Sequence, residues 1–376
     1  MNPPEILFET LSGRNGDIGL IMLNRPSMLN ALNQSMCIAM YAQMMEWAQA
    51  PNIKAVIIRG AGDKAFCAGG DIRSLYELRD KPIPEKPFFW YEYRLNRCIF
   101  HFPKPYIALL DGITMGGGVG LSVNGAFRVA TEKVKLAMPE TGIGFFPDVG
   151  GSYFLPRSVG KTGCYLGLTG KAVGIADACY TGLVNAYVPS EKLPSLLDAL
   201  RDAEWTDTKE NAKGPGSSIK GASDAHDTAR EVISTFTATP PPADLERHRV
   251  MIDTCFGQET LEELAQQLNR EQDPWARETT ELLLTRSPTS VKVVFEQLKR
   301  GAHMGFDDCM RMEYRMALQF LRTPDFYEGV RAAVIDKDRN PHWQPKLLIT
   351  VSEKDVAAFF APSQQRELAF ENGVLE

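Results

Sequence analysis

The 376-residue chain lacks both the long apolar runs of membrane-spanning helices and the Lys/Arg-rich runs of nucleic-acid-binding surfaces. Its formal net charge is −6, and we expect neither nucleic acid nor a membrane among its partners. The N-terminus shows no signal or transit pattern, which predicts a cytoplasmic protein. The remaining composition, 44% hydrophobic and 23% charged, is typical of a soluble globular protein with a large core.

Patterns of metal binding and disulfide bonding are missing as well. The seven cysteines are odd in number and never spaced as CxxC, and the five histidines do not cluster. We therefore expect neither a zinc site nor a disulfide framework, and reduced thiols fit better. Cys67 has no basic partner near it in sequence, which favours a packed residue over a nucleophile.

Short apolar runs and helical patterns alternate in the first half of the chain. Strands are predicted at residues 18–23, 54–59, 105–111 and 126–131, and a helix within 30–48. Strands separated by helical stretches indicate an α/β architecture with crossover connections.

Composition divides the chain into three parts. Residues 1–205 are expected to form the catalytic core, and residues 246–376 a helical region that completes the fold. Residues 206–245 are polar and rich in glycine and proline, which predicts a connector or insertion with a short helix within 230–236. Further helices are predicted at 244–255, 260–269, 275–285, 290–300 and 306–321.

A glycine run, residues 116–118 and 120, follows the strand at 105–111 and is expected to open a helix. Helix N-termini offer unpaired N–H groups to anions, and glycine allows a substrate to approach them. The run matches neither GxGxxG nor a phosphate loop, and close packing of a helix on a strand would explain it equally well. A second glycine-rich turn, residues 68–70, follows the strand at 54–59, so that two turns together are able to supply two N–H donors to one oxyanion.

Two acids, Glu140 and Asp148, stand in an apolar, glycine-rich stretch that is expected to be a loop. A carboxylate in such surroundings can have a raised pKa and act as base, acid or nucleophile. Solvated loop acids or helix caps are the structural alternative. The proximity of the glycine run favours a functional pair.

Several segments carry a resemblance to a known family. They are LNRPSMLNALN (23–33), KAFCAGGDI (64–72), GITMGGGVGLS (112–122) and MPETGIGFFPDVGGSYFLPR (138–157). These segments resemble the crotonase superfamily of acyl-CoA enzymes. The chain also resembles the 3-hydroxyisobutyryl-CoA hydrolase branch of this superfamily. The matching segments are the PET and FPDVGG pair, RSPTS (286–290), MEYR (312–315) and the block at 325–345. The resemblance implies a crotonase-like α/β fold, a spiral of ββα turns with a helical C-terminal region.

The resemblance also implies roles for single residues. It places the carbonyl of an acyl-CoA thioester between the N–H groups of Ala68 and Gly117, and it assigns catalysis to Glu140 and Asp148. Glu92, within WYEYRLN, matches a substrate-contacting glutamate. No metal is implied and no cofactor, since CoA is part of the substrate. The resemblance is compatible with a homo-oligomer, because members of the superfamily often form trimers.

The implied activity is hydrolysis of a short 3-hydroxyacyl-CoA, in particular 3-hydroxyisobutyryl-CoA in valine catabolism. Glu140 is expected either to activate water or to attack directly, and Asp148 to orient the water or the 3-hydroxyl group. Family hydratases use two glutamates, whereas this chain has Gly120 at the first position, which disfavours hydration. Two alternatives stay open: an enoyl-CoA hydratase or isomerase of the same superfamily, and a non-catalytic acyl-CoA-binding or assembly subunit.

Overall fold

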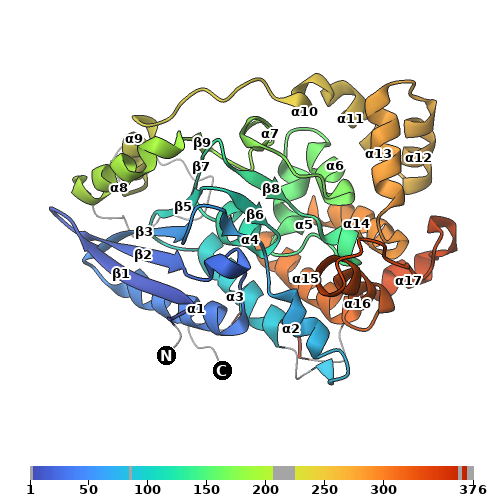
Figure 1. The fold of residues 1–376 in the computed structure, drawn as a ribbon, viewed down its shortest axis with the longest axis horizontal. Coiled ribbons are helices and arrows are strands. Elements are labelled where there is room, and N and C mark those ends of the chain that lie inside the picture. Colours follow the sequence, from blue (N-terminus) through green and yellow to red (C-terminus); the bar gives the residue numbers. More distant parts are fainter. Residues whose placement is uncertain (1–2, 84–86, 206–224, 363–365, 371–376) are drawn as a thin grey trace.

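Two β-sheets form the centre of the protein, which is known here from a computed structural model that describes residues 3–83, 87–205, 225–362 and 366–370 (Figure 1). The larger sheet has the strand order β1-β2-β3-β5-β7-β9, and only its β1–β2 pair is antiparallel. The smaller sheet, β4-β6-β8, is parallel. The strands are β1 (Ile6–Ser12), β2 (Asp17–Leu23), β3 (Ile53–Gly60), β4 (Ala65–Cys67), β5 (Tyr106–Leu110), β6 (Ile113–Met115), β7 (Phe127–Ala130), β8 (Lys135–Ala137) and β9 (Ala186–Tyr187).

The chain winds through both sheets in repeated turns. Each consecutive pair, β3–β4, β5–β6 and β7–β8, places one strand in the larger sheet and one in the smaller. Helices then lead the chain to the next pair. The helices of this part are α1 (Gln34–Gln49), α2 (Ile72–Glu77), α3 (Phe88–Phe100), α4 (Gly117–Val123), α5 (Gly151–Phe154), α6 (Thr162–Thr169), α7 (Ile175–Tyr180), α8 (Leu193–Asp202) and α9 (Ala225–Ser234). This arrangement is the expected ββα spiral, and the four predicted strands are β2, β3, β5 and β7.

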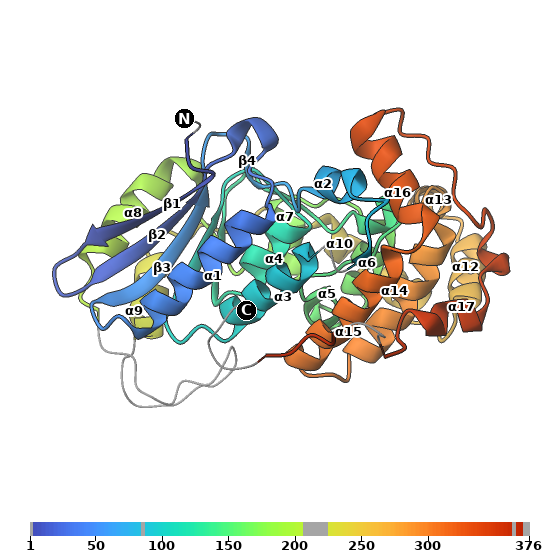
Figure 2. The same cartoon turned by 90° about the horizontal axis from the view of Figure 1, so that it is seen from below.

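The two faces of the larger sheet belong to different cores, because neighbouring residues of a strand point to opposite faces. Ile57 of β3 pairs with Leu20 and Ile107, and these side chains pack beneath α8 and α9. The next residue, Ile58, joins the main core, which includes the buried side of α1 and of α3. Figures 1 and 2 show α8 and α9 on one side of this sheet and α1 and α3 on the other.

The structure describes the second part of the predicted connector, residues 206–245. Residues 206–224 lie outside the described residues. The helix predicted within 230–236 is α9, which begins earlier, at Ala225, and buries Ala229 and Ile233 against the sheet. The three-part division of the chain itself stays a prediction.

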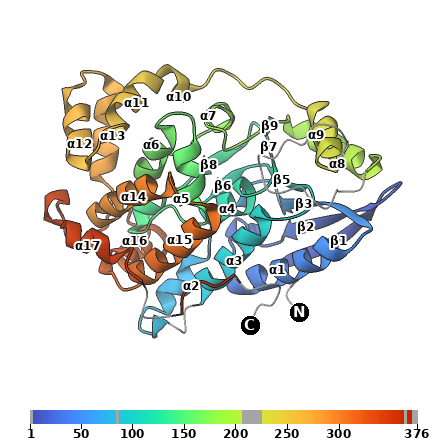
Figure 3. The ribbon, with the colours of Figure 1, turned by 180° about the vertical axis from the view of Figure 1, so that it is seen from behind.

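The C-terminal region is helical, as the periodicity predicts, and packs on the spiral. Its helices are α10 (Asp244–Arg247), α11 (Arg249–Phe256), α12 (Leu261–Arg270), α13 (Pro274–Leu284), α14 (Pro288–Gly301), α15 (Phe306–Phe320), α16 (Pro324–Val330) and α17 (Glu353–Ala358). Seen from behind, α15 lies against α3 (Figure 3). Rings of Phe145 and Phe146 contact Phe320, so one hydrophobic cluster spans both regions. No helix within the described ranges is both long and apolar enough to cross a membrane.

Candidate active site

The glycine run makes room for two carboxylates. Gly116 links β6 to α4 with φ +48°, a conformation that favours glycine. A β-carbon on Gly116 would lie 2.8 Å from Oε1 of Glu140, and one on Gly117 would lie 2.6 Å from Oε1 of Glu92. The absence of a β-carbon at Gly116 and Gly117 therefore leaves the space in which the two acids approach the N-terminus of α4. The structure brings Glu92, Glu140 and Gly117 together, as the resemblance implies.

Glu140 begins the 3-10 helix η3 (Glu140–Ile143) and is only 6% exposed. Its Oε2 atom has no hydrogen-bond partner among the described residues. Burial, and then the charge of Asp148, raises the pKa of Glu140 well above its ordinary value. A buried carboxylate with an unpaired oxygen is suited to reach a substrate or a water molecule.

Asp148 lies on a tight turn before α5. Its Oδ2 accepts a hydrogen bond of 2.8 Å from the Tyr93 hydroxyl of α3. The next residues, Val149 and Gly150, have φ +52° and +99°, and a positive φ is costly for a β-branched residue such as valine. Asn124 holds this turn, because its Nδ2 donates to the carbonyl of Val149 at 2.9 Å. Burial raises the pKa of Asp148 to about 7, although the bond from Tyr93 lowers it.

Glu92, Glu140 and Asp148 form one electrostatic group. Burial raises the pKa of Glu92 well above its usual range, and the charges of Asp148 and Glu140 raise it further. In a buried site, the charge of one carboxylate disfavours ionisation of the next, so the protonation of these acids is linked. The hydrogen bond from Tyr93 favours the negative charge on Asp148. Such a group is able to hold a proton on one acid while another acts as base.

Glu313 of α15 was not singled out from the sequence, although it lies in the MEYR segment. It is fully buried, and its two oxygens accept hydrogen bonds of 2.8 Å from the N–H groups of Gly150 and Ser152. Gln297 of α14 donates to the carbonyl of Pro147 at 2.7 Å. Both residues thus hold the turn that carries Asp148. Burial raises the pKa of Glu313 to about 8, against the two N–H bonds, which lower it.

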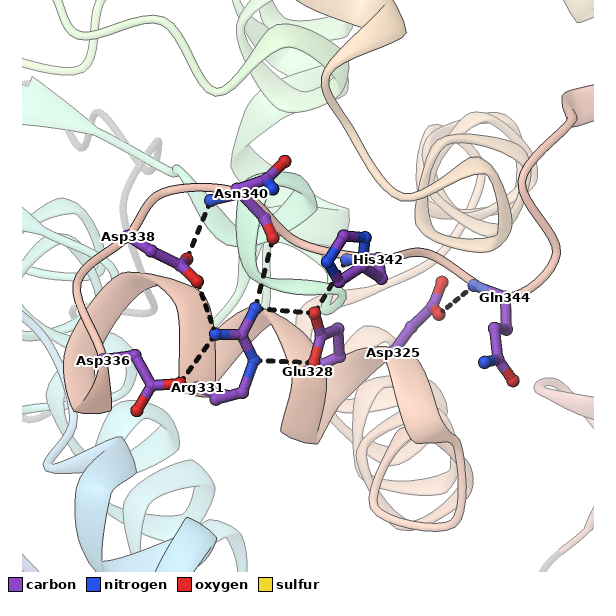
Figure 4. Close-up of polar contacts among 8 residues, drawn as sticks. All are labelled: Asp325, Glu328, Arg331, Asp336, Asp338, Asn340, His342 and Gln344. Atoms are coloured by element: carbon purple, nitrogen blue, oxygen red, sulfur yellow. Dashed lines mark hydrogen bonds and ion pairs between the residues drawn. The ribbon is translucent and has the colours of Figure 1, made fainter.

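The C-terminal block also supports η3. Ser287 donates from its N–H to the carbonyl of Thr141 at 3.1 Å and from its hydroxyl to Asp325 at 2.6 Å. Asp325 accepts a second bond of 2.7 Å from the N–H of Gln344 (Figure 4). The helix that begins with Glu140 is therefore bonded to Ser287, more than 140 positions away, and through it to Asp325.

Arg331 folds the end of this block back on α16. Its guanidinium donates to both oxygens of Glu328, at 2.8 and 2.9 Å, and to Asp336 and Asp338 at 2.7 Å each (Figure 4). It also donates to the carbonyl of Asn340 at 3.1 Å. This cluster keeps the following residues, including Gln344, in place beside Asp325.

The prediction that the N–H group of Ala68 is an oxyanion donor is wrong in this structure. Its N–H already donates to the carbonyl of Leu29 at 3.0 Å and is not available to a substrate. Gly69, with φ +114°, turns the chain, and the nitrogen of Gly70 lies 3.3 Å from where a β-carbon of Gly117 would stand. No bond donated by the Gly70 N–H is found among the described residues. The geometry therefore pairs Gly70, and not Ala68, with Gly117.

The remaining glycines show close packing. A β-carbon on Gly118 would lie 2.9 Å from Cβ of Cys67, so helix-on-strand packing explains this position. One on Gly120 would lie 2.7 Å from Cγ2 of Val149 and 2.9 Å from Nδ2 of Asn96. A glutamate at Gly120 has no room. Burial raises the pKa of the Cys67 thiol to about 12, which makes it a poor nucleophile at neutral pH.

Comparison with known proteins identifies the family. The model of the enoyl-CoA hydratase/isomerase family matches residues 18–360. The chain belongs to this family. A relative from Danio rerio is 43% identical over 97% of this chain and 91% of its own length. A relative from Homo sapiens is 42% identical over 96% of this chain and 91% of its own length. Both are named 3-hydroxyisobutyryl-CoA hydrolase, mitochondrial.

Solved structures of family members share the fold. A carnitinyl-CoA dehydratase from Mycobacterium thermoresistibile aligns with a TM-score of 0.87 and 35% identity, covering 99% of this chain and 100% of its own. An enoyl-CoA hydratase from Rhodobacter sphaeroides aligns with a TM-score of 0.83 and 33% identity, covering 98% of this chain and 100% of its own. The expected crotonase-like fold is thereby confirmed. The expected cytoplasmic location is contradicted, because the hydrolase relatives are named as mitochondrial enzymes.

Proposed function

We propose that this protein hydrolyses 3-hydroxyisobutyryl-CoA to 3-hydroxyisobutyrate and CoA, the reaction of valine degradation after which its relatives are named. The observation that carries the proposal is Glu140, a buried acid that approaches the N-terminus of α4 through the space left by Gly116. Burial, and then the charge of Asp148, keeps its pKa raised. No separate cofactor is proposed, since CoA enters as part of the substrate.

The carbonyl oxygen of the thioester accepts hydrogen bonds from the N–H groups of Gly70 and Gly117. Attack on the carbonyl carbon moves negative charge onto this oxygen, and preorganised N–H groups stabilise that charge. Loss of one such donor costs about 2.7–4 kcal/mol of barrier in comparable sites. The N-terminus of α4, where Gly117 lies, adds the positive end of a helix dipole.

Glu140 acts in its ionised form by one of two routes. In the first, it takes a proton from water, the hydroxide adds to the carbonyl carbon, and the C–S bond breaks as the CoA sulfur receives a proton. In the second, a Glu140 oxygen forms an anhydride with the acyl group, CoA leaves, and water then cleaves the anhydride. Asp148 orients the attacking water and relays its proton.

The two routes differ in the fate of the Glu140 oxygens. A single turnover in ¹⁸O-water, followed by mass analysis of the peptide that contains Glu140, tests for an anhydride that water opens at the Glu140 carboxyl carbon. Label in the peptide requires this anhydride route, and an unlabelled peptide beside a labelled product excludes it, because water has then attacked the acyl carbon.

The activity itself is tested by CoA release from a panel of short thioesters. We expect the highest kcat/KM for 3-hydroxyisobutyryl-CoA or 3-hydroxypropionyl-CoA, since both carry a 3-hydroxyl group. A panel in which no 3-hydroxyacyl thioester is hydrolysed above the rate of the protein-free control would refute the proposal.

Hydration is the second candidate, because the two aligned structures are described as a dehydratase and a hydratase. The packing of Val149 and Asn96 against Gly120 speaks against it, since no second glutamate fits there. Crotonyl-CoA hydration as fast as CoA release from 3-hydroxyisobutyryl-CoA would favour the hydratase. Activity measurements test a non-catalytic acyl-CoA-binding role, and sedimentation measures the oligomeric state.

A further inference from the structure

Helices α3 and α4 face each other across the candidate site. Glu92 of α3 lies against Gly117 of α4, and one turn further Asn96 lies against Gly120. The Nδ2 atom of Asn96 is 2.9 Å from the position of a β-carbon on Gly120. Residues four apart share a helix face, so Asn96 points to the same side of α3 as Glu92.

Asn96 is fully buried, yet neither polar atom of its amide has a hydrogen-bond partner in the described part of the chain. An amide offers two donors and an acceptor, and buried polar groups in folded proteins are nearly always paired. Asn124, which ends α4, follows this rule, because its Nδ2 donates to the carbonyls of Gly120 and Val149. The unpaired amide of Asn96 beside the acids therefore indicates a missing ligand group.

We propose that Asn96 binds the 3-hydroxyl group of the acyl chain and thereby selects 3-hydroxyacyl thioesters over those without a hydroxyl. This role rests on the proposed thioester hydrolysis. A hydroxyl both donates and accepts, which matches the carbonyl and amino groups of an amide.

The spacing along α4 agrees with this role. Gly117 contributes an N–H to the thioester carbonyl, and Gly120, which faces Asn96, lies three residues or about 4.5 Å further along the helix. The 3-hydroxyl group is attached two carbons from the carbonyl carbon and is able to span this separation. Asp148, whose Oδ2 is bonded to Tyr93, is then left to orient water.

The test compares two substrates in one variant. Asn96→Leu keeps the approximate volume of the side chain and removes both polar atoms. The ratio of kcat/KM for 3-hydroxyisobutyryl-CoA to that for isobutyryl-CoA is expected to fall about 10- to 100-fold, with hydrolysis of isobutyryl-CoA little changed. The ratio is independent of the fraction of folded enzyme. Asn124→Leu, the matched control, breaks scaffold bonds and lowers both rates together.

An equal fall for both substrates in Asn96→Leu would make Asn96 a structural residue and overturn the proposal. Wild-type protein that hydrolyses neither substrate would instead refute the proposed function. If the leucine variant does not fold, a crystal structure of the wild type with a thioether analogue of the substrate decides. A 3-hydroxyl group within hydrogen-bond distance of the Asn96 amide supports the proposal, and one directed elsewhere contradicts it.

Discussion

Glu140 in the spiral and Glu313 in the C-terminal helical region are both buried acids with raised pKa values. Glu313 has both oxygens paired with backbone N–H groups, whereas Oε2 of Glu140 has no partner in the residues described. The paired acid holds a turn, and the unpaired acid is open to a substrate. Burial and a raised pKa are common to both acids, and only the pairing of their oxygens differs, which is why the catalytic role is proposed for Glu140.

The largest effect is expected for Glu140→Gln. Removal of the base or nucleophile should lower kcat by about 10²–10⁴-fold, because the amide can neither take a proton nor form the anhydride. Stability should stay equal or rise at pH 8, since burial disfavours the charged form of Glu140 and glutamine carries no charge. CoA release and urea unfolding measure the two effects. CoA release as fast as in wild type would instead support the non-catalytic alternative.

The matched change at the other acid, Glu313→Gln, should act mainly on stability. The amino group of glutamine opposes one of the two N–H donors of Gly150 and Ser152, so the free energy of unfolding should fall by about 1–3 kcal/mol. The loosened turn displaces Asp148, and kcat should fall less than in Glu140→Gln. Urea unfolding that shows equal losses for both variants would remove the distinction between the two acids.

A smaller effect is expected for Tyr93→Phe. In the wild type, the Tyr93 hydroxyl lowers the pKa of Asp148, so its removal should raise that pKa above about 7. If ionised Asp148 is needed, the rising limb of the pH profile of kcat/KM moves to higher pH. Tyr106→Phe is the control, because that buried hydroxyl donates to the carbonyl of Leu121, away from the acids. A profile that moves equally in both variants would contradict the assigned role of Tyr93.

The smallest effect concerns stability and pH. Asp148 and Glu313 have raised pKa values of about 7 and about 8, so the folded protein binds more protons than the unfolded chain between about pH 4 and 8. The free energy of unfolding should therefore fall as pH rises across this range. Asp148→Asn should reduce the slope measured by urea unfolding from pH 5.5 to 8.5. A slope unchanged by this substitution would mean that Asp148 is already ionised throughout.

Local patterns predicted much of the spiral. The apolar runs of the sequence coincide with strands β2, β3, β5 and β7 of the structure, because strand and helix periodicities are local properties. The acids Glu140 and Asp148 stood out because carboxylates are rare in apolar sequence. The donor at Ala68 was wrong because the backbone turn at Gly69 decides which N–H group is free, and residue type alone does not show this.

The sequence by itself determined four strands of the larger sheet, the helix after the glycine run and the identity of the two acids, because each depends on residues close in the chain. Only the tertiary structure decided why the glycines are needed. Gly116, Gly117 and Gly120 leave space for Glu140, Glu92 and Asn96, which come from other helices. It also assigned the support of Asp148 to Glu313, more than 160 positions away, because hydrogen bonds between distant segments form only when the chain packs.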